Sequence, residues 1–258
     1  MFGKSLSWIL LFSIVSFCGS GFAASALTMG DAIDKAGRQR MLTQRMIKSY
    51  SLVGMKLKPG AEHEMEGAAS LFSAQLAELT AFAEGDAERE QVGRITLLWG
   101  DLRTELDQPP SLDRAGEFND LAELLLQESH KLVLILEKRS GTVAGKLVNI
   151  SGRQRMLSQR IAKIYLLETW GLGSDVMARQ YEGAVSDFSD ALVLLMEFRM
   201  NTPDIAEGLA AVKKNWDIFG ISKFSQKYEA RVPSLVVRSM DKILVQVNGI
   251  TAMYAQLH

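Results

Sequence analysis

Residues 37–50 read Gly37-Arg-Gln-Arg-Met-Leu-Thr-Gln-Arg-Met-Ile-Lys-Ser-Tyr50, and residues 152–165 read Gly152-Arg-Gln-Arg-Met-Leu-Ser-Gln-Arg-Ile-Ala-Lys-Ile-Tyr165. Ten of the fourteen positions are identical, at a spacing of 115 residues. A repeat of this kind predicts a tandem duplication. The retained residues are mostly polar, whereas a hydrophobic core alone would tolerate their drift. We therefore expect a specific interaction to hold these polar side chains in place.

The rest of the chain predicts helices in the same order twice. Apolar periodicity and Gly or Pro breaks indicate helices in the first unit at residues 31–56, 62–84, 88–106 and 114–140. The second unit repeats the plan, and residues 182–189 echo residues 66–73.

We therefore expect an all-α fold of two tandem four-helix up-down bundles, at residues 27–140 and 146–258, packed as a pseudo-dimer. The glycine-containing junction at residues 140–145 either turns the chain or lets the fourth helix continue into the fifth. A continuous helix would keep the two repeated segments apart.

The first 26 residues have the pattern of a secretory signal peptide. Lys4 precedes an apolar run at residues 6–17, and Ala24-Ser25-Ala26 fits an A-x-A cleavage site. The alternative is an uncleaved amino-terminal anchor. No later segment reaches the roughly 18 apolar residues of a membrane span, so we expect a periplasmic protein with no span in the mature chain.

Composition excludes several classes of function. Cys18 is the only cysteine and lies in the signal segment, which excludes disulfides and thiol chemistry from the mature chain. The 29 basic and 30 acidic residues nearly balance, so nothing favours nucleic acid as a partner. We expect no cofactor.

One face of the first helix has the spacing of a helix–helix seam. This seam carries Ile33, Gly37, Arg40, Gln44 and Ile47, and its counterpart in the second unit carries Val148, Gly152, Arg155, Gln159 and Ala162. The simplest partner for each seam is the other one.

Such packing would bring Arg40 and Arg155 face to face. At about 5 Å and an effective dielectric constant near 20, their repulsion is roughly 3 kcal/mol. A bound anion removes that repulsion, and the planar guanidinium suits a planar oxyanion. The candidate ligand-binding residues are Arg40, Arg155, Gly37, Gly152, Gln44 and Gln159. The alternative is that the two arginines pair with carboxylates, such as Glu128 or Glu168.

The other residues of the motif have simpler interpretations. Arg38, Arg45, Arg153 and Arg160 are expected to be solvated or salt-bridged, and Tyr50, Tyr165, Lys48 and Lys163 to close or screen the edge of the core. Trp99 and Trp216 are expected to pack in the core.

The run Gly-Arg-Gln-Arg-Met-Leu-Ser/Thr-Gln-Arg resembles the signature of the PilJ-type ligand-binding domain of type IV pilus and other methyl-accepting chemotaxis transducers. It is also similar to the nitrate-sensing segment of nitrate/nitrite sensor kinases. This resemblance implies a four-helix bundle that dimerises through its first helix, with an arginine three residues after the glycine from each subunit holding one nitrate. Here those positions are Arg40 and Arg155, beside Gly37 and Gly152.

We therefore expect a small-anion binding or sensing protein, for nitrate or nitrite first, that reports to a membrane receptor or sensor kinase. The alternative is a ligand-free helical adaptor of a pilus, envelope or chemoreceptor assembly. An enzyme is the weakest interpretation, because His63, His130 and His258 lie far apart without a matching carboxylate spacing. Haem binding through His130 is the remaining cofactor alternative.

Overall fold

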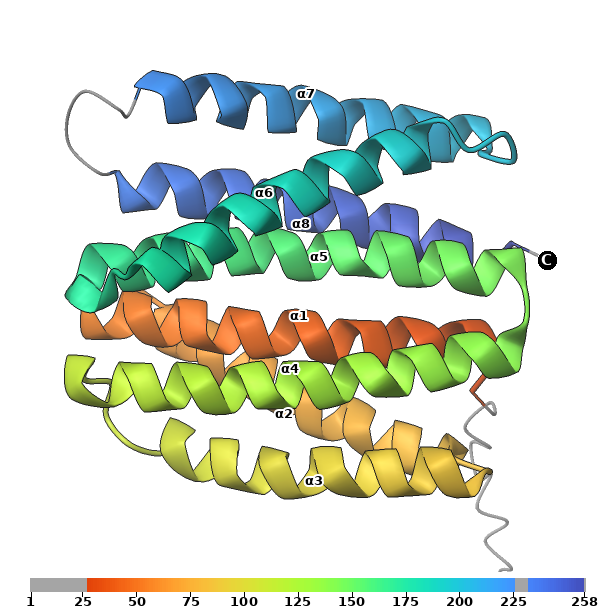
Figure 1. The fold of residues 1–258 in the computed structure, drawn as a ribbon, viewed down its shortest axis with the longest axis horizontal. Helices are drawn as coiled ribbons and strands as arrows, with labels where there is room; N and C mark the ends of the chain where they lie inside the picture. The colour runs from red at the N-terminus through yellow and green to blue at the C-terminus, as the bar shows by residue number, and fades with distance from the viewer. Residues whose placement is uncertain (1–26, 226–231, 258) are drawn as a thin grey trace, which may run out of the picture.

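The computed structural model describes residues 27–225 and 232–257, and within them the protein is all-helical, as predicted (Figure 1). Residues 1–26, where a signal peptide is expected, and His258 lie outside the described residues. The helices are α1 (Met29–Gly54), α2 (Ala61–Phe82), α3 (Asp86–Leu106), α4 (Leu112–Ser140), α5 (Val143–Leu167), α6 (Asp175–Met196), α7 (Pro203–Ser225) and α8 (Pro233–Ala255). A π-helical turn, Glu168–Leu172, extends α5.

Local sequence accounts for the ends of the two repeated helices. Thr28 and Asp31 form a capping box that satisfies free N–H groups at the start of α1. Thr142 caps α5 by accepting a hydrogen bond from the Gly145 N–H. Gly141 ends α4 with a φ of 62°, a left-handed conformation that favours glycine.

The chain therefore turns at Gly141 instead of continuing as one helix. The turn reverses its direction, so that α4 and α5 are antiparallel while α1 and α5 run the same way (Figure 1). This reversal is what lets the two repeated segments lie side by side.

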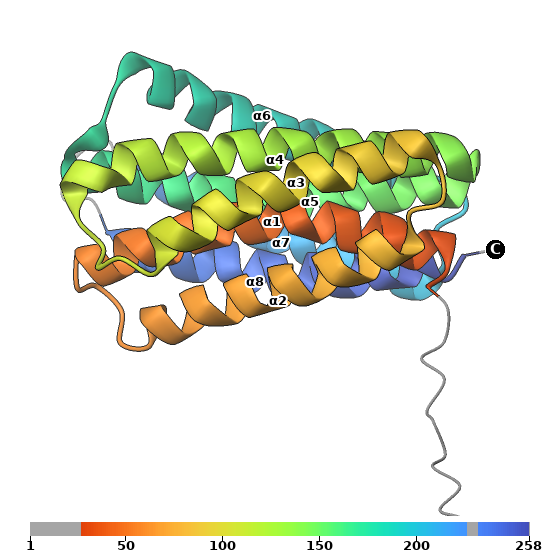
Figure 2. The same ribbon diagram turned by 90° about the horizontal axis from the view of Figure 1, so that it is seen from below.

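The helices α1 and α5 form the centre of the molecule and make the most extensive helix–helix contact. α1 also packs against α2 and α4, and α5 packs against α6 and α8. The outer helices α3 and α7 pack mainly on α4 and α8, and Figure 2 views the molecule from the side of α2 and α3. Each half thus supplies one central helix that contacts the other half.

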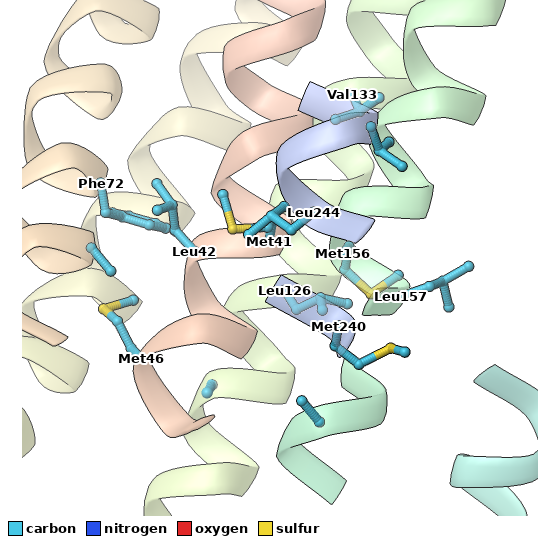
Figure 3. Close-up of a cluster of buried hydrophobic side chains, with 14 of the residues drawn as sticks. Met41, Leu42, Met46, Phe72, Leu126, Val133, Met156, Leu157, Met240 and Leu244 are labelled. Carbon is cyan, nitrogen blue, oxygen red and sulfur yellow. The ribbon is translucent and has the colours of Figure 1, made fainter. Parts of the chain in front are cut away.

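The apolar core runs through both halves as one continuous cluster. Figure 3 shows part of it: Leu42 of α1 points toward Phe72 of α2, and Met41, Met156 and Leu244 come from α1, α5 and α8. The proposal of two bundles at residues 27–140 and 146–258 therefore refers to sequence units that share a core.

The two tryptophans pack in this core, as expected. Trp99 stacks on Phe72 with ring centroids 4.4 Å apart, and Trp216 packs on Phe188 at 4.1 Å. Among the residues that the structure describes, no helix is long and apolar enough to cross a membrane.

Candidate functional site

The predicted seam lies at the contact between α1 and α5. Its side chains are buried in both helices, including the guanidinium groups of Arg40 and Arg155, which are 1% and 0% exposed. Because α1 and α5 each have several neighbouring helices, even their polar residues are enclosed by protein. Buried charges need partners, so the surroundings of these two arginines decide what the site can do.

Two glycines make room for the two guanidinium groups. A Cβ atom on Gly37 would lie 3.3 Å from Arg40 Nη2 and 3.6 Å from Arg155 Nη2. A Cβ atom on Gly152 would lie 3.2 Å from Arg155 Nη2 and 3.6 Å from Arg40 Nη2. Both guanidinium groups therefore border the same small space between the two glycines.

Each arginine also reaches across to the backbone of the other helix. Arg40 Nη2 donates to the carbonyl oxygen of Asn149 at 3.4 Å, and Arg155 Nη2 donates to the carbonyl oxygen of Asp34 at 3.3 Å. Asp34 and Asn149 both lie six residues before the arginine of their own helix. These two long hydrogen bonds are equivalent in the two halves and fix the register of α1 against α5.

The side-chain partners of the two arginines differ. Arg155 Nη2 forms an ion pair with Asp34 Oδ1 at 2.6 Å, and Arg38 Nη2 contacts the other oxygen of the same carboxylate at 2.9 Å. Arg40 instead donates from Nη1 to His130 Nδ1 at 3.0 Å, and its Nε lies 3.5 Å from the Gly37 carbonyl oxygen. All hydrogen-bond acceptors of Arg40 in the described residues are therefore neutral.

The carboxylate pairing proposed for both arginines is found for Arg155 alone. Its partner is Asp34, not Glu128 or Glu168, because the contact between α1 and α5 places Asp34 across from it. Glu128 bonds to Gln91 and Lys131 on the outer side of α4.

Burial and like charge both act on the pKa values of this cluster. Burial, and then the charges of Arg155 and Arg153, lower the pKa of Arg40 to about 9, against an opposing effect of Glu137. Burial also lowers the pKa of Arg155, although Asp34 opposes it. Both effects express the free-energy cost of holding two charged guanidinium groups together away from water.

His130 is held neutral beside Arg40. Burial, followed by the charges of Arg40 and Arg153, lowers the pKa of its imidazole to about 4. Since Nδ1 accepts the hydrogen bond from Arg40, the ring proton of the neutral form lies on Nε2.

A surface hollow of about 460 Å³ leads toward this cluster. Its lining includes His130 and Asn149, which both accept hydrogen bonds from Arg40, together with Arg153. Arg153 forms an ion pair with Asp187 at 2.7 Å, as expected for an outer arginine of the motif. His130 and Asn149 therefore border both the hollow and Arg40.

The two glutamines of the motif are engaged elsewhere. Gln44 donates to Glu123 Oε1 at 3.0 Å, and Gln159 donates to Asp241 Oδ1 at 3.2 Å. Their side-chain nitrogens are thus bonded to carboxylates, and a contact with a ligand at the arginine pair stays a prediction.

The same carboxylates take the two lysines of the motif. Lys48 bonds to Asp241 at 2.5 Å and Lys163 bonds to Glu123 at 2.7 Å, and each pair joins one half of the chain to the other. Our prediction that these lysines lie at the edge of the core is wrong, because both are at most 1% exposed. The central helices have neighbours on nearly every side, so a lysine there forms a buried ion pair instead of screening the edge of the core.

Sequence reasoning missed four residues of this network, Asp34, Asn149, Glu123 and Asp241, and considered His130 only as a haem ligand. Only the lysines carried a usable signal, because Lys48 and Lys163 are among the ten identical positions of the repeat. A lysine at the same repeat position of both central helices indicates a buried carboxylate partner for each on another helix.

Within the described part of the chain, no group of three or more His, Cys, Asp or Glu residues could hold a metal ion. Residues 22–121 match the family model described as "Type IV pili methyl-accepting chemotaxis transducer N-term" (PilJ). No curated protein and no solved structure matches the chain. The matched segment contains the first motif with Arg40, so this part of the chain is similar to a sensory, non-catalytic helical domain of chemotaxis transducers.

Proposed function

We propose that this protein is a periplasmic binding or sensing protein that holds one small planar oxyanion, nitrate or nitrite first, between Arg40 and Arg155. The observation that carries the proposal is the meeting of two fully buried guanidinium groups beside Gly37 and Gly152, of which only Arg155 contacts a carboxylate. Arg155 Nε and Nη1 form no hydrogen bond with any described residue. Together with the Arg40 guanidinium, these groups offer more N–H donors than the protein's own acceptors bind.

The charge balance supports an anion over a neutral ligand. Removing a guanidinium from water costs several kcal/mol even after relaxation, and a second guanidinium beside it adds repulsion. An oxyanion between the two forks offsets both effects through charge-assisted hydrogen bonds. The pKa of Arg40, lowered to about 9 by burial and by Arg155, reflects the strain that such an anion would relieve.

Location and partners follow from the resemblance and the signal segment. PilJ amino-terminal domains are typically periplasmic sensor domains, which agrees with the export signal expected at residues 1–26. The protein would then report anion binding to a membrane receptor or sensor kinase. Anion binding would be transmitted by a movement of α1 against α5, because the proposed ligand site lies at the contact between these helices.

Thermal melts with nitrate, nitrite, chloride and sulfate test the proposal. A ligand at a hundredfold excess over its dissociation constant stabilises the folded protein by about 2.7 kcal/mol. We expect the largest rise in melting temperature with nitrate or nitrite, and no rise in the double variant Arg40→Ala with Arg155→Ala. Arg94→Ala, at an exposed ion pair of α3, is the matched control and should respond like the wild type. Equal melting temperatures in all four salts, or an unchanged nitrate response in the double variant, would disprove the site.

A second candidate function is a helical adaptor of a chemoreceptor or envelope assembly. Val193, Leu194 and Met200, at the end of α6 and just after it, are 48%, 50% and 63% exposed. Exposed apolar side chains grouped in this way are typical of protein-binding surfaces. Loss of a partner on changing these three residues to serine, with melting unaffected by small anions, would favour the adaptor.

A further inference from the structure

The two halves of the candidate site differ at one position that matters for charge. Six residues before Arg155 the chain has Asn149, and six residues before Arg40 it has Asp34. Their backbone carbonyls take equivalent hydrogen bonds, one from each motif arginine. Only the Asp34 side chain contacts a motif arginine, since the Asn149 amide turns away and donates to Glu137 of α4.

The charges that act on the two motif arginines can be assigned one by one. The positive charges are the guanidinium groups of Arg40 and Arg155 themselves and those of Arg38 and Arg153, which act on them. Three carboxylates accompany them: Asp34 contacts Arg155 and Arg38, Asp187 contacts Arg153, and Glu137 acts on Arg40 by its charge. His130 is neutral at physiological pH. With four guanidinium groups and three carboxylates, the cluster therefore carries a net charge of plus one.

We propose that Asp34 is a built-in counter-anion that sets this cluster to accept one monovalent oxyanion and to reject divalent ones. The inference rests on the proposed function, because it names the charge class of the ligand at that same site. Asp34 occupies part of the Arg155 fork, so the ligand bonds chiefly to Arg40 and to the remaining Arg155 donors. One negative charge neutralises the cluster.

A divalent anion would meet a different balance. Its second charge would face the Asp34 carboxylate, which is mostly buried, with its side chain 13% exposed. At about 7 Å and an effective dielectric constant near 20, one pair of like charges repels by roughly 2 kcal/mol, which corresponds to more than tenfold in affinity. Sulfate should therefore bind at least about tenfold more weakly than nitrate, although it offers more oxygen acceptors.

The repeat offers a matched set of variants. Asp34→Asn makes the two halves alike and adds one net positive charge, so sulfate affinity should rise at least about tenfold relative to nitrate. Asn149→Asp adds one negative charge and neutralises the cluster, so nitrate affinity should fall by a similar factor. The double exchange of Asp34→Asn with Asn149→Asp restores the net charge and should restore nitrate affinity and selectivity. If Asp34 had a merely structural role, an aspartate on the other helix would not restore nitrate affinity and selectivity.

Isothermal titration calorimetry of the full chain with sodium nitrate and sodium sulfate measures these ratios. Glu78→Gln is the control, because Glu78 pairs with Lys35 away from the cluster, and it should leave selectivity unchanged. Melting curves without added anion identify any variant that fails to fold. In that case Glu137→Gln, which also removes one carboxylate but no direct contact of either motif arginine, should still increase sulfate binding.

The outcomes separate the two proposals. If no anion binds to the wild type, the proposed function fails together with this inference. If nitrate binds to the wild type but neither Asp34→Asn nor Glu137→Gln increases sulfate binding, the site stands and the role of Asp34 is refuted. If the double exchange behaves like Asn149→Asp alone, net charge does not set the selectivity and the inference is overturned.

Discussion

Replacing Arg40 by methionine should stabilise the ligand-free protein, although both copies of the repeat carry this arginine. Burial and the neighbouring arginines lower the Arg40 pKa well below its ordinary value, to about 9. At about 1.36 kcal/mol for each pKa unit, the charged form is disfavoured by up to about 5 kcal/mol in the folded state. Relaxation and the lost hydrogen bonds to His130 and Asn149 reduce this value, so we expect Arg40→Met to raise the free energy of unfolding by about 1–3 kcal/mol.

The assay is urea denaturation at pH 7 in a zwitterionic buffer without added salt, followed by circular dichroism. Arg155→Met is the matched comparison, and it should lower stability by about 1–3 kcal/mol because it removes the ion pair with Asp34. Nitrate should stabilise the wild type and leave Arg40→Met unchanged. A loss of stability above about 1 kcal/mol in Arg40→Met would mean that Arg40 fastens the two helices, and the charge argument would be refuted.

Three further predictions concern other parts of the protein. Glu123→Gln leaves a buried lysine without its counter-charge, so urea denaturation should show a loss of about 3 kcal/mol, and an unchanged midpoint would contradict the ion pair. The pKa of His130 is lowered to about 4 from 6.5, so the unfolded state binds the proton first and stability should fall as pH drops from 6.5 to 4. We expect the free energy of unfolding to fall by about 1–2 kcal/mol over this pH range, because the ring is partly exposed. His130→Gln should remove most of this pH dependence. Gly54→Ala would place a Cβ atom 2.2 Å from the Trp170 ring and should cost about 1–3 kcal/mol, whereas Gly67→Ala, with open space around it, should gain about 0.5–1 kcal/mol in thermal melts.

Periodicity was sufficient to predict the helices and the seam face of α1, whereas the contact between α1 and α5 also depended on the turn at Gly141, which the sequence left open. Breaks such as Lys58-Pro59-Gly60 and Pro109-Pro110 interrupt the hydrogen-bond ladder of a helix whatever the tertiary context, so the helix bounds could be predicted to within a few residues. The seam through Gly37 and Arg40 follows from helical geometry in the same way.

The partners of the polar side chains could not be predicted. A helical wheel assumes one apolar face and one solvated face, whereas α1 and α5 are enclosed on nearly all sides. Lys48 and Lys163 therefore find carboxylates on α8 and α4, at sequence distances that no local pattern encodes.

The asymmetry of the site was beyond sequence reasoning for another reason. Whether an acid six residues upstream reaches an arginine depends on the distance and register between two helices. Asp34 lies on the same helix as Arg40 but pairs with Arg155 across the contact, so the wheel of one helix alone cannot identify its partner.

A crystal structure of the protein grown in excess nitrate tests the central claim most directly. The account predicts one planar anion between Arg40 and Arg155, bonded to Arg40 and to Arg155 Nε or Nη1, with Asp34 still paired to Arg38. Crystals in nitrate that show the two guanidinium groups without an anion between them would contradict it.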